Sequence, residues 1–567
     1  MTLLSTLSKD APATVLAPDG GTAQRSGPAD PAAESAPGAV EAATRGTAQD
    51  MYFFASIEDF PPGIGDLGLT HDDAQGFHDY VKQFNTPNGW FRDGQVGQWM
   101  YEETYDNYLD DYGFDAARVV YHSGHGGMDD NGVFWLPVGN DWGGDVWTSS
   151  NDMRLGNEYA RYVFWSTCLS LRVKNGHSPI RTWSAANLGL RMIFGYETVS
   201  VDNGDYGKFF FQEWNKHHKL STAFLDASWR ISNAQEPSVV ACGATQAEAT
   251  DRLFNEDAFY AAPASTAWWW WRWYDAARAR ARNLRIPGGG RSAKLAPTMP
   301  SHEGLAAWAE RFEVAVPRDA RERGLHGGVL LRGDGGTRIA IGPDGSRDVR
   351  LADPADTDRQ LGSEQAVRAA RRAVDQYRLA ENVDLILDTV RYDRHAGGSA
   401  DERVDAKVRE TMVSFVQVVD GVPVVSADGG RVQVRIDNEG TVTGIADSTR
   451  QIRDLRDQPA VPPPPADARS SRTRRAPSRT SGGGENGVAA TGDAEVDAAL
   501  DGALQRRLHR AAAGGRFPSA VRAVPNTTEV GYALRDGDAV LVARREVELD
   551  FGSGLAKRYV LEEQIDS

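Results

Sequence analysis

A histidine and a cysteine, each placed after a short apolar segment, are the residues of this sequence best suited to chemistry. His125 follows the segment 119–121 and stands among three glycines, and Cys168 follows the segment 161–167. Short runs of β-branched and aromatic residues predict buried strands. If these strands are parallel neighbours, their carboxyl ends bring both side chains to one edge of the sheet, where open α/β folds have their sites. A thiol beside an imidazole is a nucleophile–base pair.

The two residues have complementary roles in acyl transfer. The thiolate is the nucleophile, and an imidazole can accept the thiol proton and later give it to the leaving amine. The glycines around His125 allow a sharp turn and leave amide N–H groups accessible. We expect the amides of Gly126 and Cys168 to stabilise the oxyanion of the intermediate.

Each residue also has a structural explanation. A buried cysteine at a strand end usually acts as a small hydrophobic residue, and His-Gly usually marks a turn. The repetition of one pattern, strand and then reactive residue, favours catalysis. His122 and His125 form His-x-x-His, but the surrounding glycines disfavour a helix and no glutamate stands between them. We therefore predict no metal and no cofactor.

The pattern of an apolar strand, Ser-Gly-His-Gly, a second apolar strand and then Cys resembles that of the caspase-like cysteine peptidases. The resemblance covers about residues 51–255 and implies cleavage of peptide bonds after one preferred side chain. It places the catalytic histidine at His125 and the nucleophile at Cys168. The Gln-Ala-Cys-x-Gly signature of caspases is absent, since 166–170 is Ser-Thr-Cys-Leu-Ser. Glu197 and Asp145 are candidates to receive a basic substrate side chain, although either carboxylate can equally be an ordinary surface acid.

The segments around these residues predict an α/β fold. Segments 51–57, 119–121, 161–167 and 191–197 are strand-like and alternate with amphipathic helical segments, which favours a mainly parallel sheet flanked by helices. The run 267–274, which contains five tryptophans, is interpreted as a helix buried between domains; an aromatic ligand platform is the alternative.

A second folded region, 301–456, has a helix at 363–377 and strands at 383–390, 413–419 and 431–436. The segments 415–424 and 438–442 resemble the propeptide domain of fungalysin and thermolysin-type peptidases and PepSY modules. That resemblance implies an α+β module that inhibits or assists an attached peptidase, and an intramolecular contact between the two domains.

The remaining segments complete the predicted domain organisation. Residues 1–50 form a disordered tail, 51–285 the peptidase domain, 286–300 a linker, and 457–492 a disordered Pro/Gly-rich linker. Residues 493–567 form a C-terminal α+β segment with a helix at 493–513 and strands at 529–534, 539–549 and 557–562. This segment either completes the sheet of the second module or forms a third unit.

Bulk composition limits the partners. With a net charge of −17, the protein is not expected to bind nucleic acid or anionic membranes. No apolar stretch is long enough to span a bilayer, and the N-terminus lacks a signal-peptide pattern. We expect a cytoplasmic protein, or an extracytoplasmic one if the start site is misassigned. Two cysteines exclude a disulfide framework.

Two functions follow as hypotheses. The first is a cysteine endopeptidase with a Cys168–His125 dyad, acting on a protein or peptide substrate, with a C-terminal module that regulates the site or presents substrate. The alternative is a catalytically inactive caspase-like scaffold that binds partners.

Overall fold

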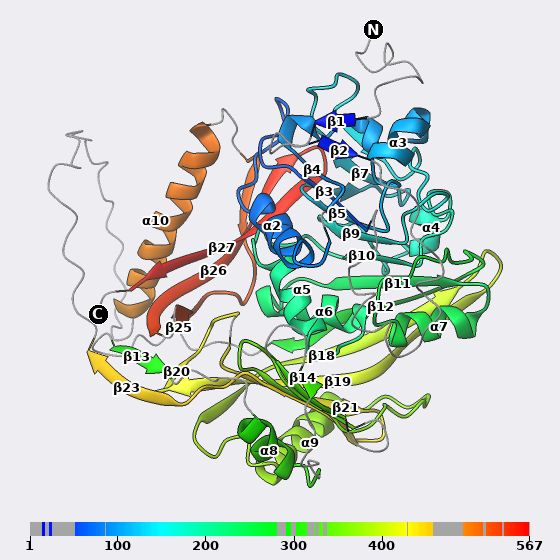
Figure 1. Ribbon diagram of the computed structural model, residues 1–567. Coiled ribbons are helices and arrows are strands. Elements are labelled where there is room, and N and C mark those ends of the chain that lie inside the picture. Colours follow the sequence, from blue (N-terminus) through cyan, green and yellow to red (C-terminus); the bar gives the residue numbers. More distant parts are fainter. Residues whose placement is uncertain are drawn as a thin grey trace, which may run out of the picture.

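The computed structural model joins strands of both predicted folded regions into one sheet of 16 strands (Figure 1). The structure describes residues 14–16, 22–24, 51–85, 87–279, 291–295, 302–314, 322–323, 328–332, 337–427, 429–457, 491–513, 518–535 and 538–565. The predicted tail 1–50 and linker 457–492 lie outside these residues, apart from two short strands in the tail and the ends of a strand and a helix at the linker.

One end of the large sheet is parallel. In spatial order it consists of β4 (Gly89–Arg92), β3 (Tyr52–Ser56), β5 (Val119–Ser123), β9 (Tyr162–Ser166) and β10 (Met192–Tyr196). Each of these strands runs parallel to its neighbour. Every residue of β3, β5, β9 and β10 is buried, which explains why these segments are almost continuously apolar.

Beyond β10 the strand direction reverses. β11 (Pro237–Gly243) is antiparallel to β10, β12 (Trp268–Ala279) is antiparallel to β11, and β18 (Asp384–Gly398) is antiparallel to β12. The sheet therefore continues from the first predicted domain into the second. Without β18, the outer edge of β12 would expose unpaired backbone N–H and C=O groups.

The remaining strands of this sheet are also antiparallel to their neighbours. In chain order they are β14 (Glu322–Arg323), β15 (Val329–Arg332), β16 (Arg338–Ile341), β17 (Arg347–Arg350), β19 (Arg403–Val419), β20 (Val422–Pro423), β21 (Arg431–Asp437) and β22 (Val442–Asp447).

The predicted fold class, a caspase-like mainly parallel sheet flanked by helices with a separate smaller α+β module, is therefore wrong. The described residues form one large mixed sheet in which antiparallel pairings predominate. The physical reason is that an apolar run predicts burial of a strand but carries no information about its direction. The parallel end alone agrees with the expected strand direction.

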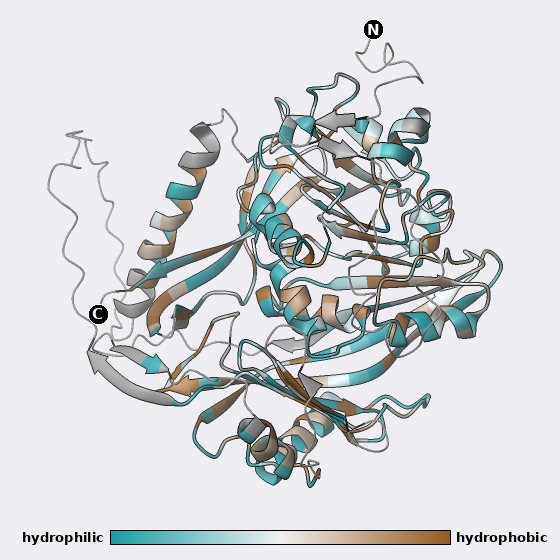
Figure 2. Ribbon diagram, in the orientation of Figure 1, coloured by the Kyte–Doolittle hydropathy of each residue, from teal (hydrophilic) through white to brown (hydrophobic). Residues whose placement is uncertain are grey.

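The two faces of the parallel end belong to different hydrophobic clusters because successive side chains of a strand point to opposite faces. On β3, for example, Phe53 and Ala55 join one cluster, whereas Tyr52 and Phe54 join the other. The second cluster lies under the helices α2 (Thr70–Val81), α5 (Tyr206–Trp214), α6 (Leu220–Ile231) and α7 (Gln246–Asn255). In Figure 2, hydrophilic residues predominate on α7.

The opposite face is covered by short elements and by the C-terminal segment. The short elements are η3 (Asp93–Gln95), η4 (Gln98–Met100), η5 (Glu103–Tyr105), α3 (Asp106–Tyr112), α4 (Pro179–Trp183) and a small sheet of β6 (Gly127–Met128), β7 (Phe134–Pro137) and β8 (Trp147–Ser149). Core residues of the C-terminal segment, such as Leu541 and Leu555, belong to the same cluster as Phe53.

The C-terminal segment forms a third sheet rather than completing the large one. Its helix is α10 (Thr491–Ala513), and its strands are β24 (Ala520–Ala523), β25 (Glu529–Arg535), β26 (Asp538–Gly552) and β27 (Leu555–Gln564), joined by β13 (Arg291–Leu295) and β23 (Ile452–Asp457). Figure 1 shows the β26–β27 hairpin running from α10 toward the parallel end of the large sheet. A further pair, β1 (Thr14–Leu16) with β2 (Thr22–Gln24), lies near the N-terminus.

The second region contains the expected helix and strands. Helices α8 (His302–Glu310) and α9 (Ser363–Gln376) share a core with β19, β21 and β22. The strands expected at 383–390, 413–419 and 431–436 are present; β18 and β19 are longer than predicted because they form an extended antiparallel ladder with each other.

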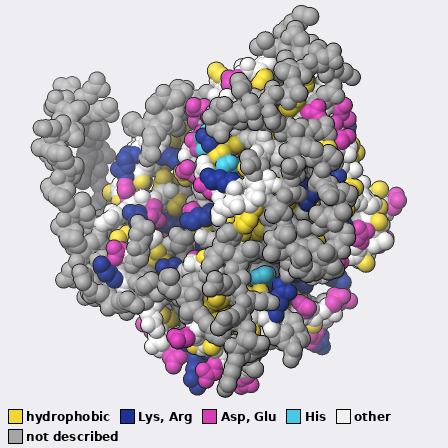
Figure 3. Space-filling model, in the orientation of Figure 1, with side chains coloured by type: hydrophobic (Ala, Val, Ile, Leu, Met, Phe, Trp, Pro, Cys, Tyr) yellow, Lys and Arg dark blue, Asp and Glu magenta, His cyan; other side chains and the backbone are white. Residues whose placement is uncertain are grey.

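The tryptophan-rich run is a strand, β12, and not the predicted helix. Trp269, Trp270, Trp271 and Trp273 are each at most 4% exposed, so the run is sheet core and not an exposed aromatic platform. Acidic and basic side chains are interspersed over the described surface of the face in Figure 3. No helix among the described residues has the length and apolarity needed to cross a membrane.

Candidate active site

The ends of β5 and β9 lie side by side, as expected from the sequence. Ser123 and Ser166 are paired at the carboxyl ends of the two parallel strands, and the amide of Gly124 donates to the carbonyl of Ser166 at 3.4 Å. The chain leaves β5 toward His125 and leaves β9 toward Cys168. Both predicted catalytic residues therefore lie at the same edge of the sheet.

His125 is fully buried and has one unpaired ring nitrogen. Its Nε2 lies 2.9 Å from the carbonyl oxygen of Gly65 and therefore carries the proton, because a carbonyl can only accept. Its Nδ1 has no hydrogen-bond partner in the described structure, so the lone pair of this nitrogen is available. The ring packs between those of Phe60 and Phe551, with centroids 4.9 and 5.2 Å away. Burial, and then the nearby charge of Lys557, lowers the pKa of His125 to about 3.

Cys168 is also buried, and its sulfur lies in a polar environment. The backbone N–H of Ser200 donates to Sγ at 3.3 Å, and the Ser200 hydroxyl lies 3.5 Å from Sγ. The thiol donates to the carbonyl oxygen of Ala556 at 3.0 Å. The structure records no hydrogen bond between Cys168 and His125, so the two side chains share the site without being paired.

The predicted oxyanion donors lie beside each other. A β-carbon built on Gly126 would be 2.9 Å from the carbonyl oxygen of Cys168, so the two backbone segments are in close contact. Within the described residues, neither the Gly126 nor the Cys168 amide donates a hydrogen bond to a protein acceptor. The next residue, Leu169, has a φ of 57°, a left-handed conformation that is unusual for leucine and is often found at functional sites.

Asp73 holds the end of β5 through hydrogen bonds, and this role was not identified from the sequence. This buried carboxylate accepts hydrogen bonds from Tyr121 (2.6 Å) and Ser123 (2.7 Å) of β5 and from the amide of Gly207 (3.1 Å). Burial raises the pKa of Asp73 to about 6. In the sequence, an aspartate in the first turn of a helix is explained by helix capping alone, so no signal pointed to this role.

The C-terminal strand β27 contributes residues that the sequence analysis also missed. The carbonyl of Ala556 accepts from the Cys168 thiol, and the Lys557 ammonium lies 3.4 Å from the carbonyl oxygen of Gly124 and 3.1 Å from the hydroxyl oxygen of Ser200. Lys557 is only 2% exposed. The sequence predicted a strand at 557–562 but contained no information about its neighbour.

The two predicted pocket carboxylates lie in different places. Glu197 is buried and bound to the backbone N–H groups of Val173 and Lys174, the second at 3.2 Å, so it holds the turn after Cys168. Asp145 lines a cavity of about 780 Å³ beside the β26–β27 turn. The other acidic residues lining this cavity are Glu102, Asp129 and Asp152, and no lysine or arginine lines it.

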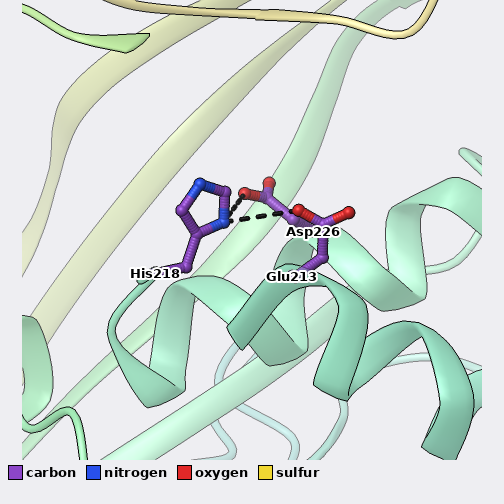
Figure 4. Close-up of side chains that lie close together, drawn as sticks. All are labelled: Glu213, His218 and Asp226. Atoms are coloured by element: carbon purple, nitrogen blue, oxygen red, sulfur yellow. Dashed lines mark ion pairs between the residues drawn. The ribbon is translucent and has the colours of Figure 1, made fainter. Parts of the chain in front are cut away.

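A separate buried cluster, Glu213, His218 and Asp226, has the residue types of a metal site (Figure 4). The imidazole Nδ1 lies 3.4 Å from a Glu213 oxygen and 3.6 Å from an Asp226 oxygen, and Nε2 lies 3.2 Å from Asp348. These carboxylates raise the pKa of His218 despite its burial, which favours the charged imidazolium.

Cations already compensate these carboxylates. Lys216 and Arg230 each lie 2.9 Å from Glu213, and Arg391 and Arg435 pair with Asp226. Positively charged groups therefore occupy the positions around these carboxylates, and the cluster does not fit a metal ion. It is a buried ion-pair network that joins α5 and α6 to β17, β18 and β21.

Residues 54–273 match the model of a family described as Domain of unknown function (DUF6345). The matched range contains His125, Cys168 and Ser200 and ends within β12, so it does not include β27. A comparison with curated proteins finds no match.

Proposed function

We propose that this protein is a cysteine peptidase in which Cys168 is the nucleophile and His125 the base. The observation that carries the proposal is the arrangement at the ends of β5 and β9: a thiol in a polar site, and a buried imidazole whose Nδ1 is unpaired. The resemblance of the Ser-Gly-His-Gly and Cys segments to caspase-like peptidases supports the same assignment.

The residues would act in the following order. His125 Nδ1 accepts the Cys168 proton as sulfur forms a bond to the substrate carbonyl carbon. The amides of Gly126 and Cys168 stabilise the resulting oxyanion. The imidazolium then gives its proton to the leaving amine, and water hydrolyses the thioester with the imidazole again as base. Ser200 holds the sulfur through its amide, and Asp73 positions the end of β5.

A second candidate function is that of a catalytically inactive binding protein with the same fold. One observation favours it: the hydrogen bonds of the thiol go to Ser200 and Ala556 and not to His125. In that case the site is a docking position for the C-terminal strand.

Labelling with a panel of peptidyl acyloxymethyl ketones distinguishes the two. These electrophiles require an activated thiol, so mapping the adduct identifies the nucleophile. Once β27 is displaced from the thiol, we expect an adduct on Cys168 that is lost in His125→Ala, with Cys242→Ala as the matched control because Cys242 is also a free, buried thiol. Labelling of Cys168 that is independent of His125, or no labelling even after β27 is displaced, would contradict the peptidase.

A further inference from the structure

The turn between β26 and β27 lies against His125 and the glycines that follow it. Gly552, Ser553 and Gly554 have φ values of 81°, 53° and 78°, so the chain reverses direction within three residues. A β-carbon on Gly127 would lie 3.0 Å from the Gly554 carbonyl oxygen, so the turn packs directly on the glycines that follow His125. The Phe551 ring contacts the His125 ring from the same turn.

β27 is hydrogen-bonded on both edges. One edge pairs with β26 along its length. On the other edge, the Arg558 amide donates to the Ser200 carbonyl at 3.1 Å, and the Asp202 amide donates to the Arg558 carbonyl at 2.7 Å. The segment that holds the Cys168 sulfur therefore also binds β27 through main-chain bonds, which is how extended peptides are bound at a free sheet edge.

Two residues of β27 contact the site individually, Ala556 through its main chain and Lys557 through its side chain. Ala556 places its backbone carbonyl oxygen 3.0 Å from the thiol. The neighbouring Lys557 ammonium is buried against two oxygens, of Gly124 and Ser200, and no carboxylate among the described residues forms an ion pair with it. A buried lysine without a counter-ion is costly, so these two acceptors are the contacts that retain it.

We propose that residues 554–558 occupy this site as a bound peptide would. The site takes an extended peptide with a main-chain carbonyl opposite Cys168 and a lysine at the next position, and β27 acts as the built-in inhibitor that keeps other peptides out. This inference rests on the proposed function only in treating the site as a peptide site, and it deepens that function by naming the ligand class and the regulation.

The bound strand explains why the site is closed in this state. The thiol donates its proton to the Ala556 carbonyl oxygen, so the proton stays on sulfur and is not passed to His125. Leu555 and Gly554 cover Gly127, and beyond them lies the acid-lined cavity that contains Asp145. Displacing β27 exposes the thiol and the imidazole beside this cavity.

A matched pair of full-length variants tests the closure. Lys557→Glu replaces three donors by a carboxylate that faces two oxygens and should expel the strand, whereas Lys557→Gln keeps an N–H donor and should retain it. Iodoacetamide labelling of Cys168, with Cys242 as the internal control, measures access. We expect labelling of Cys168 to be about tenfold faster in Lys557→Glu and within a factor of about two of native in Lys557→Gln.

Hydrogen exchange of 555–564, measured on the same samples, reports whether the strand has left. Native labelling as fast as that of Lys557→Glu, or increased exchange without faster labelling, would overturn the closure. Unchanged exchange in Lys557→Glu would overturn the role of Lys557 in holding the strand.

A synthetic peptide with the sequence 551–562 tests the ligand class. Added to the Lys557→Glu protein, it should protect Cys168 from iodoacetamide, and the same peptide carrying the Lys557→Glu change should not. Equal protection by both, or by neither, would overturn the proposed recognition. Because labelling with a small reagent needs no catalysis, an exposed thiol that cleaves nothing would refute the peptidase and leave the closure intact. Cleavage by the native chain with β27 in place would refute the closure and leave the peptidase intact.

Discussion

The carbonyl oxygen of Ala556 lies 3.0 Å from the sulfur of Cys168, although 388 positions separate the two residues in the chain. This contact joins β27 to the residue best suited to nucleophilic chemistry. Whether β27 is bound or displaced therefore determines whether the site is accessible.

Gly126→Ala should damage the site more than the fold. The new β-carbon would lie 2.8 Å from the Phe134 ring and 2.9 Å from the Cys168 carbonyl, so the two amides proposed to bind the oxyanion must separate. We expect loss of His125-dependent labelling of Cys168 and a destabilisation of about 1–3 kcal/mol from overpacking, measured by urea unfolding.

Gly502→Ala is the matched control for that change. It lies within α10, with only the Arg506 side chain near, at 3.5 Å, and should stabilise the protein by about 0.5–1 kcal/mol with labelling unchanged. Full labelling of Cys168 in Gly126→Ala would show that the amides of Gly126 and Cys168 are not needed for the reaction.

Arg507 should hold β27 in place from α10. Its guanidinium pairs with Asp202 at 2.7 Å and lies 3.9 Å from the Tyr559 ring centroid. Removing it in Arg507→Ala should increase hydrogen exchange in β27 and speed the alkylation of Cys168 about two- to tenfold, since a partly exposed ion pair and cation–π contact contribute only about 1 kcal/mol.

The neighbouring Arg506 offers the control, because its partner Glu563 lies near the far end of β27. Arg506→Ala should leave alkylation at the native rate. Equal rates in both variants would show that α10 does not control access through Arg507.

The Arg272–Asp393 pair should link the two halves of the large sheet. Arg272 of β12 donates to Asp393 of β18 at 3.1 Å, and both side chains are at most 3% exposed. Arg272→Met leaves a buried carboxylate without its partner and should cost about 3–5 kcal/mol in urea unfolding.

The double variant Arg272→Met/Asp393→Leu should recover most of that loss, because two apolar side chains replace two charges. A loss below about 1 kcal/mol in the single variant would indicate that water or another cation compensates Asp393.

Stability should fall in acid because of two buried histidines. Burial, and secondarily Lys557, lowers the pKa of both His122 and His125 to about 3. Both are neutral in the folded state, whereas the unfolded chain takes up protons below about pH 6.5. Each histidine therefore removes about 1.4 kcal/mol of stability per pH unit as the pH falls from 6.5 toward 3.

The charge of Lys557 provides the internal comparison. In Lys557→Met the pKa of both histidines in the folded state rises, so the loss of stability over the same pH range should be smaller. Asp73 and Asp115, with pKa values raised to about 6 by burial, titrate in both proteins and cancel in the difference. Identical acid unfolding curves, recorded by circular dichroism, would exclude the coupling to Lys557.

The sequence was informative where local composition determines structure. The apolar runs before His125 and Cys168 predicted buried strands that end at one edge of a sheet, and β5 and β9 have that arrangement. The strands of the second region were likewise visible, two as strand-like runs and the one at 431–436 from its alternation. In each case the signal lies within a few neighbouring residues.

The remaining features depend on long-range pairing. Consecutive tryptophans at 268–271 have no period that separates a helix from a strand buried on both faces, so β12 was mistaken for a helix. No local pattern shows that β18 extends the sheet at β12, or that Lys557 lies at Gly124. These contacts are chosen by tertiary packing and the pairing of free backbone groups.

The separation of Cys168 and β27 by 388 positions has a consequence for synthesis. A ribosome adds about 5–20 residues per second, so roughly 20–80 s pass between the emergence of Cys168 and that of the strand that covers it. During this interval the nascent chain carries the thiol and the imidazole without their cover. A chain that has not yet been translated through β27 therefore cannot be closed in the proposed way.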